Sequence, residues 1–235
     1  MKKLLLAVLL LGGQSTFACT SCNEELQNAL FDSMFYPNLF TMLLAFIILA
    51  VIVTLLAFLA AQREKKHHLQ YGHKLTVVPL LSASVTLGIG IGGFVDGIVL
   101  HQILQWHEML SNKIPPVTLI SKSVNMFWDG IFHLFCLLVV IIGLVLLVRL
   151  FSRKDVIVSM KTFIGGLFVG WGVFNIVEGI IDHHILKLHN VREITPNIEL
   201  WNFGFLGLSV LLIIIGYFLI RRGTPVHLYA KKIDI

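Results

Sequence analysis

The chain has 235 residues, of which 57% are hydrophobic and only 13% are charged, and its mean hydropathy is +0.87. This composition excludes a disordered chain, a disulfide-stabilised scaffold and an ordinary soluble enzyme, because a soluble domain carries about 25% charged residues. The net charge of +5 does not indicate nucleic-acid binding, since the 18 lysines and arginines stand in short clusters between apolar runs. The sequence therefore predicts an integral membrane protein whose main partner is the lipid bilayer.

Residues 1–18 have the pattern of a secretory signal peptide. Lys2 and Lys3 precede an apolar stretch, and residues 16–18 are typical of a cleavage site. Cleavage would leave Cys19 at the mature N-terminus, where lipid modification is one alternative. An uncleaved first helix is the other.

The next segment, residues 19–37, is expected in the periplasm and opens with a C-x-x-C motif formed by Cys19 and Cys22. Two cysteines at this spacing can form a disulfide, exchange electrons or bind Cu(I). We favour a structural or redox disulfide over a metal site. No histidine follows Cys22, so the motif is not one for c-type haem attachment.

Five apolar runs follow, each close to the roughly 20 residues that cross a bilayer. They are residues 38–61, 76–100, 126–148, 162–183 and 201–220. The segments after the first, third and fifth runs hold 12 of the 18 basic residues, whereas the opposite loops hold four. Because basic loops stay in the cytoplasm, we expect a bacterial inner-membrane protein with a periplasmic N-terminus and a cytoplasmic tail at 223–235.

Two stretches that lie 82 positions apart resemble each other. Val95-Asp96-Gly97-Ile98 is followed by His101 and His107, and Val177-Glu178-Gly179-Ile180 is followed by His183 and His189 at the same spacing. Trp128-Asp129 and Trp201-Asn202 also correspond loosely in the helices that follow. We therefore predict an all-α membrane protein in which one N-terminal transmembrane helix precedes a four-helix bundle of two parallel repeats, residues 75–150 and 161–222.

Ionisable side chains are concentrated at the periplasmic ends of these runs, where burial is expensive and usually marks function. Imidazoles and carboxylates from several helices are typical ligands of Fe, Zn, Mn or Cu in bundle cores. The candidate metal ligands are Asp96, His101, His107, Asp129, His133, Glu178, Asp182, His183 and His189. The identity of the metal and the presence of one ion or two stay open.

Helical geometry limits which of these groups can meet. Asp129 and His133 share a face at i,i+4. His101, in contrast, would point about 140° away from Asp96 in a regular helix at about 100° per residue, and the same holds for the second pair. Either the helices are distorted, which Gly97 and Gly179 would permit, or the groups divide between ligands and their supports.

Three other interpretations of this polar layer remain. It could be a buried network that only locks the helices, a path for protons or ions, or a site for b-type haem between paired histidines. Haem leaves four carboxylates without a role. If the layer is a metal site, we expect His133→Ala and Glu178→Ala each to remove bound metal.

The run from Gly92 to His107 resembles a bacterial family of predicted integral membrane proteins of unknown function. Asp129-Gly130-Ile131-Phe132-His133 and the stretch from Asn175 to His183 are similar to two further signatures of that family. The resemblance covers residues 75–222 and implies a membrane fold and the positions of the motifs. It implies no reaction.

Two classes of function are therefore open: a metalloenzyme that acts on a lipid-side or periplasmic substrate, and a protein that transports or hands on metal ions or protons. A transporter needs polar groups that continue inward. The inner halves of the last four runs hold little beyond a few serines and one threonine, which favours a closed site. A homo-oligomer or another membrane subunit is left open as a partner.

Overall fold

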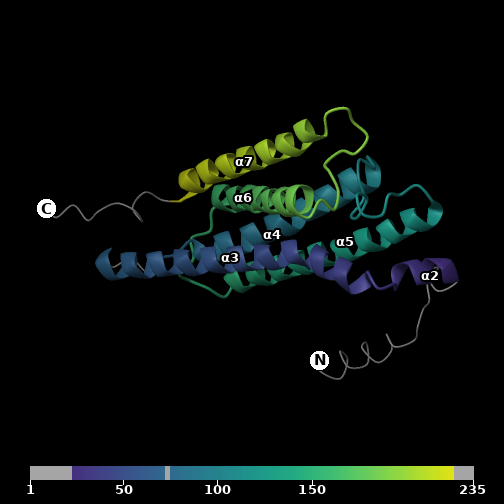
Figure 1. The fold of residues 1–235 in the computed structure, drawn as a ribbon. Coiled ribbons are helices and arrows are strands. Elements are labelled where there is room, and N and C mark those ends of the chain that lie inside the picture. Colours follow the sequence, from purple (N-terminus) through teal and green to yellow (C-terminus); the bar gives the residue numbers. More distant parts are fainter. Residues whose placement is uncertain (1–22, 72–74, 225–235) are drawn as a thin grey trace, which may run out of the picture.

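The computed structural model describes residues 23–71 and 75–224, and these form an all-helical protein (Figure 1). The signal peptide expected at 1–18, Cys19 and Cys22 lie outside the described residues. The elements are α2 (Glu24–Leu30), α3 (Phe35–Tyr71), α4 (Val78–Val95), η2 (Asp96–Ile103), α5 (Leu119–Leu150), α6 (Met160–Glu178), η3 (Gly179–Ile185) and α7 (Ile198–Gly223).

Five helical stretches are long and apolar enough to cross a membrane, as predicted. They are Phe35–Leu59, Val78–Ile103, Leu119–Leu150, Met160–Ile185 and Ile198–Gly223. The third begins several residues before the apolar run at 126–148, because Thr118 and Ser121 form a capping box that starts the helix on a polar turn. This extra turn lies beside the loops that enclose the polar layer.

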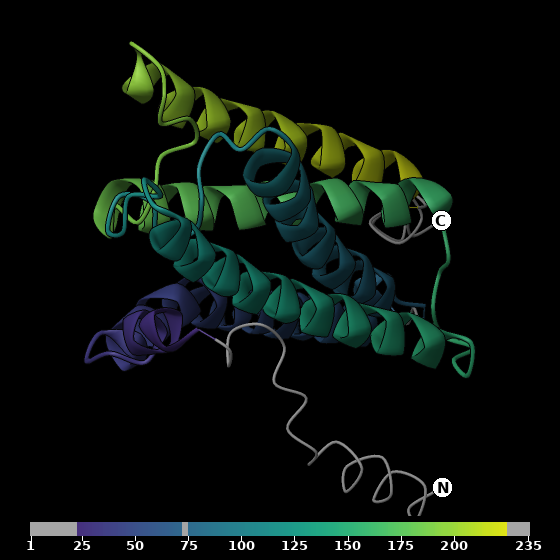
Figure 2. The same cartoon turned by 90° about the vertical axis from the view of Figure 1, so that its right-hand side faces the viewer.

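α4 and α6 lie at the centre of the bundle (Figure 2). α4 packs between α5 and α6, and α6 packs between α4 and α7. In an 18-residue stretch of each central span about half of the residues are buried, 56% and 50%, whereas in the corresponding stretches of α5 and α7 only 17% are buried. The outer helices therefore present their apolar faces to lipid, and polar groups can be shielded only around α4 and α6.

The N-terminal helices cover one side of this core. Phe46 of α3 packs against Phe132 and Phe135 of α5, with ring centroids 5.7 and 5.3 Å apart. The short helix α2 contacts the same α5, close to the end of the bundle where the loops 104–118 and 186–197 lie (Figure 1).

Glycines allow the helices to approach closely. At the contact between α6 and α7, a Cβ atom on Gly165 would lie 2.7 Å from the Gly216 carbonyl oxygen, and one on Gly216 would lie 2.6 Å from that of Gly165. Such backbone contacts supply the packing that holds helices together where lipid removes the hydrophobic driving force.

We predict that Gly216→Ala destabilises the protein, because a methyl group at this position overlaps the α6 backbone and overpacking costs about 1–3 kcal/mol. Gly207→Ala is the matched control on the same helix, since nothing lies within 4 Å of its Cβ position. Thermal unfolding in detergent should show a lower midpoint for Gly216→Ala and an unchanged or higher one for Gly207→Ala. Equal midpoints would contradict the packing argument.

Candidate metal centre

At their C-terminal ends, α4 and α6 change from α-helix to π-helix and continue as η2 and η3. A π-helix bonds residue i to residue i+5, so side chains five positions apart lie close together. Asp96 and His101 are five apart, as are Glu178 and His183. The His101 Nε2 and Asp96 Oδ2 atoms are 2.9 Å apart, and the His183 Nε2 and Glu178 Oε1 atoms are 3.9 Å apart. The distortion left open by the sequence is therefore present in both helices.

Both π-helices end in the same way. Gln105 and Lys187 have φ angles of 49° and 50°, a left-handed conformation that commonly ends a helix and reverses the chain. The Trp106 amide donates to the Leu100 carbonyl, and the Leu188 amide donates to that of Asp182. These turns direct His107 and His189, two residues further along, back over the open ends of the helices.

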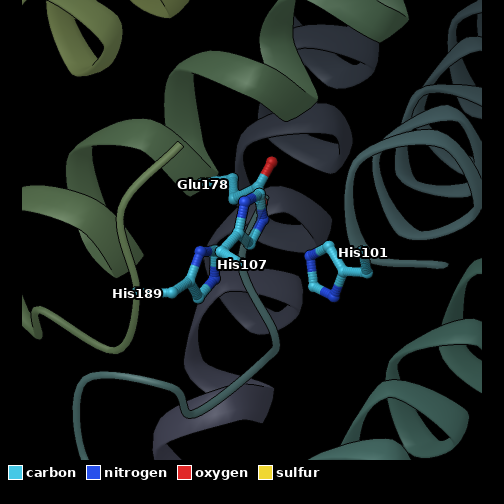
Figure 3. A group of neighbouring side chains, drawn as sticks. All are labelled: His101, His107, Glu178 and His189. Atoms are coloured by element: carbon cyan, nitrogen blue, oxygen red, sulfur yellow. The ribbon is translucent and has the colours of Figure 1, made fainter. Parts of the chain in front are cut away.

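Four side chains then meet at one place (Figure 3). Each of His101, His107, Glu178 and His189 offers one ligand atom, and these four atoms lie within 4.8 Å of one another. All four residues are buried. Figure 3 shows that they come from different segments: His101 from η2, Glu178 from the end of α6, and the other two from the loops.

Most of the atoms that converge here lack hydrogen-bond partners. Among the described residues, this holds for Nε2 of His107, both oxygens of Glu178 and both ring nitrogens of His189, whereas Nε2 of His101 is paired with Oδ2 of Asp96 at 2.9 Å. A buried polar group without a partner costs about 1–3 kcal/mol. A metal ion bound by these atoms would remove several such costs at once.

The other ring nitrogen of His101 and of His107, Nδ1, makes a hydrogen bond on the side away from the group. His101 Nδ1 lies 2.9 Å from Oδ1 of Asp129, and His107 Nδ1 lies 2.9 Å from the Val191 carbonyl oxygen. A histidine that donates Nδ1–H in this way presents a lone pair at Nε2, as metal ligands usually do, and His107 has this arrangement. His101 instead has a carboxylate oxygen 2.9 Å from each ring nitrogen. Asp129 also accepts from the Met109 amide at 2.9 Å and is therefore fixed itself.

The two histidines that lie beyond the membrane spans are in the form that binds metal. Burial lowers the pKa of His107 to about 3, and burial also lowers the pKa of His189 well below its ordinary value. Their rings stack with centroids 4.4 Å apart and an interplanar angle of 3°. Both are therefore neutral near pH 7, which metal coordination requires.

The remaining predicted ligands surround this group. Asp96 lies against His101 with its Oδ1 4.0 Å from His107 Nε2, and the His183 ring centroid lies 4.8 Å from that of His189. Asp182 is buried one residue before His183, with an unpartnered Oδ1.

Two predicted ligands, Asp129 and His133, lie outside this group, and so does the neighbouring His184. Asp129 lies behind His101, as described above. His133 is half-buried and stacks on Phe94 with a centroid distance of 6.0 Å, and a Cβ on Gly97 would collide with its Nε2 atom. His184 points its Nδ1 to the Gly179 carbonyl oxygen at 2.6 Å.

Two loops close over the site and bind each other. The Asn112 amide donates to the Leu188 carbonyl at 2.9 Å, and the Glu193 amide donates to the Trp106 carbonyl at 3.0 Å. The Arg192 guanidinium lies 5.2 Å from the ring centroids of both Trp106 and Trp201. The donor group is therefore covered by two loops, one from each half of the chain, that are bonded to each other.

Sequence reasoning missed the residues that hold these loops. Asn202 accepts from the Val191 amide at 3.0 Å, and Gln102 donates to Asp129 at 3.2 Å. The correspondence of Trp128-Asp129 with Trp201-Asn202 was the signal for the first. The Val191 carbonyl, which binds His107, could not be predicted, because a backbone group does not depend on the residue type.

Residues 83–223 match the family described as Predicted membrane protein (DUF2243). No curated protein and no solved structure matches the chain.

The loop residue Glu193 gives a prediction that is independent of any metal. Its side chain accepts from the Ser111 hydroxyl, and burial raises its pKa. The folded state therefore binds the proton more tightly than the unfolded state does, so ionised Glu193 lowers stability above its unfolded pKa. Each pKa unit of this difference corresponds to about 1.4 kcal/mol.

We expect Glu193→Gln to raise the unfolding midpoint of metal-free protein at pH 8, and this gain to disappear at pH 4, where both states are protonated. The exposed Glu199→Gln is the control for removal of one negative charge. A gain that is equal at both pH values would contradict the assignment to Glu193 ionisation.

Proposed function

The chain belongs to the family of predicted membrane proteins that it matches, and from its site we propose that it binds a transition metal ion at the periplasmic end of the bundle. The observation that carries this proposal is the convergence of four buried donor atoms within 4.8 Å, where His107, Glu178 and His189 offer atoms without a hydrogen-bond partner. Three imidazoles and one carboxylate suit Fe, Zn, Mn or Cu. Asp96, Asp182 and His183 are the further donors at its edge, and Asp129 supports it through His101.

A closed site fits the inner half of the bundle better than a transport path. The hydroxyl of Ser84 donates to the Leu80 carbonyl at 2.9 Å, and that of Ser209 donates to the Phe205 carbonyl at 2.6 Å. Both hydroxyls thus serve their own helices. We propose a metalloenzyme in which the metal supplies Lewis-acid or oxygen chemistry when it is bound.

The crowding of the site argues against b-type haem. Ring centroids of His107 and His189 lie 4.4 Å apart, those of His101 and His107 lie 4.3 Å apart, and two carboxylates fill the adjoining space. A porphyrin plane placed between any two of these imidazoles would overlap the other donors.

Two finer features belong to the same proposal. The matched π-helices, left-handed turns and histidine positions support a bundle of two parallel repeats. The excess of basic residues at the opposite end, with Arg149, Arg221 and Arg222 in last helical turns, supports an inner-membrane protein whose metal site faces the periplasm.

Removal of a central ligand tests the metal site. We expect Glu178→Gln and His107→Ala each to lose bound metal, because each removes a donor atom of the group. Elemental analysis of detergent-purified protein measures the stoichiometry, and circular dichroism checks that helicity is kept. His184→Ala is the control, since its Nδ1 is bonded to a carbonyl of its own helix.

His133 discriminates between the two ways of assigning ligands. Its place outside the four-donor group predicts that His133→Ala keeps the metal, whereas the sequence pattern alone predicts its loss. Stoichiometric metal in both the Glu178→Gln and His107→Ala proteins would contradict the proposed site.

Asp129 is a positioning residue, and its conservative variant is informative. In Asp129→Asn the side chain keeps its shape but no longer accepts from His101 Nδ1 as a carboxylate, which lowers metal affinity by about 10–100-fold. Competition with a chelator measures this affinity. The Gln102→Ala protein, which loses only a 3.2 Å bond to the same carboxylate, should change it less. Unchanged affinity in Asp129→Asn would show that His101 needs no support.

A further inference from the structure

A cavity of about 840 Å³ lies between the loop 186–197 and the start of α7. Eight of its eleven lining residues are polar or charged, including Lys187, Asn190 and Asn202, and only three are apolar. Several lining residues at the start of α7, such as Glu199, are exposed, so the cavity is open to water on this side.

His183 links this cavity to the metal-binding group. The residue borders the cavity, yet its side chain is fully buried, and neither ring nitrogen has a hydrogen-bond partner. Its Nε2 lies 3.9 Å from Oε1 of Glu178, and its ring centroid lies 4.8 Å from that of His189. The His183 side chain is therefore what separates the cavity from the donor group.

The corresponding place in the first half is closed. His101 Nδ1 is held by Asp129, which also accepts from the Met109 amide. In the second half, Asn202 follows Trp201 as Asp129 follows Trp128, and it accepts from the Val191 amide at 3.0 Å. Its amide group donates to Asn190 at 3.1 Å, and His183 Nδ1 has no hydrogen-bond partner.

A second difference between the two halves lies in how each loop is held beside its helix. Asn125, four residues before Asp129, accepts from the Leu110 amide at 2.9 Å and donates to the Ile114 carbonyl at 2.7 Å. These bonds hold the loop 104–118 against α5. Ile198, four residues before Asn202, has no polar side-chain atoms to do the same and lines the cavity instead.

From this asymmetry we infer that the cavity is the route by which a small hydrophilic anion from the periplasm reaches the metal site at His183. The inference rests on the proposed metal function and names its substrate class. Lys187 supplies positive charge at the cavity, and asparagine amides supply N–H donors, against one acidic lining residue, Glu199.

Azide binding to cobalt-loaded, full-length protein in detergent tests the route. Azide is a small anion, and Co²⁺ bound by imidazole and carboxylate gives a visible spectrum that changes when an anion joins its ligands. We expect wild-type protein to show this change. Lys187→Trp should slow azide association at least about tenfold, by blocking the cavity and removing its charge.

The repeat supplies a matched control. Gln105 has the same left-handed backbone conformation as Lys187, at 49° compared with 50°, and both side chains are exposed. Gln105→Trp therefore carries the same backbone strain on the closed side and should leave azide association unchanged. Ile198→Trp, which fills the cavity from a regular helix, should slow association as Lys187→Trp does.

Three results would count against the inference. Equal azide kinetics in Lys187→Trp, Ile198→Trp and Gln105→Trp proteins, each with full cobalt content, would overturn the route. A cobalt spectrum that azide does not change in wild-type protein would also overturn the route, but it would still support the proposed metal site. Failure of the wild-type protein to bind cobalt or any other transition metal would overturn the proposed function and this inference together.

Discussion

The structure depends on one constraint: a dense set of ionisable side chains must be kept out of lipid and still satisfied. In water each unpaired nitrogen or oxygen would find a partner, but at this depth only the protein or a bound ion can supply one. The fold meets the constraint by placing α4 and α6, the two helices that carry most of these groups, at the centre of the bundle. Their outer neighbours carry the contact with lipid, and the loops cover the exposed end.

The π-helical ends show how the constraint acts on the backbone. An α-helix would place Asp96 and His101 on different faces, so that one of them would point toward α5 or lipid. Widening the helix brings acid and histidine to one side at both η2 and η3. π-helices are rare and often found at functional sites, and here their chemical result is direct, since they add two acid–histidine pairs to one small volume.

The sequence was sufficient to predict an all-helical membrane protein with five spans, because hydropathy and charge follow directly from the bilayer. The candidate site residues stood out because a buried histidine or carboxylate in a span is costly. The sequence did not reveal that His133 is separated from the other donors while His107 and His189 are central. That outcome depends on where two loops turn, and the turns depend on left-handed backbone at Gln105 and Lys187, two residue types that give no such signal.

The pairing of the two loops also has a consequence for biogenesis. Arg192 lies between Trp106 and Trp201, and His107 is held by a carbonyl of the second loop, so the donor group is incomplete until α6 and α7 are in the membrane. During synthesis the first hairpin stands alone with Asp96, His101 and His107 and lacks both Glu178 and His189. The four-donor group is therefore complete only when segments from both hairpins have come together.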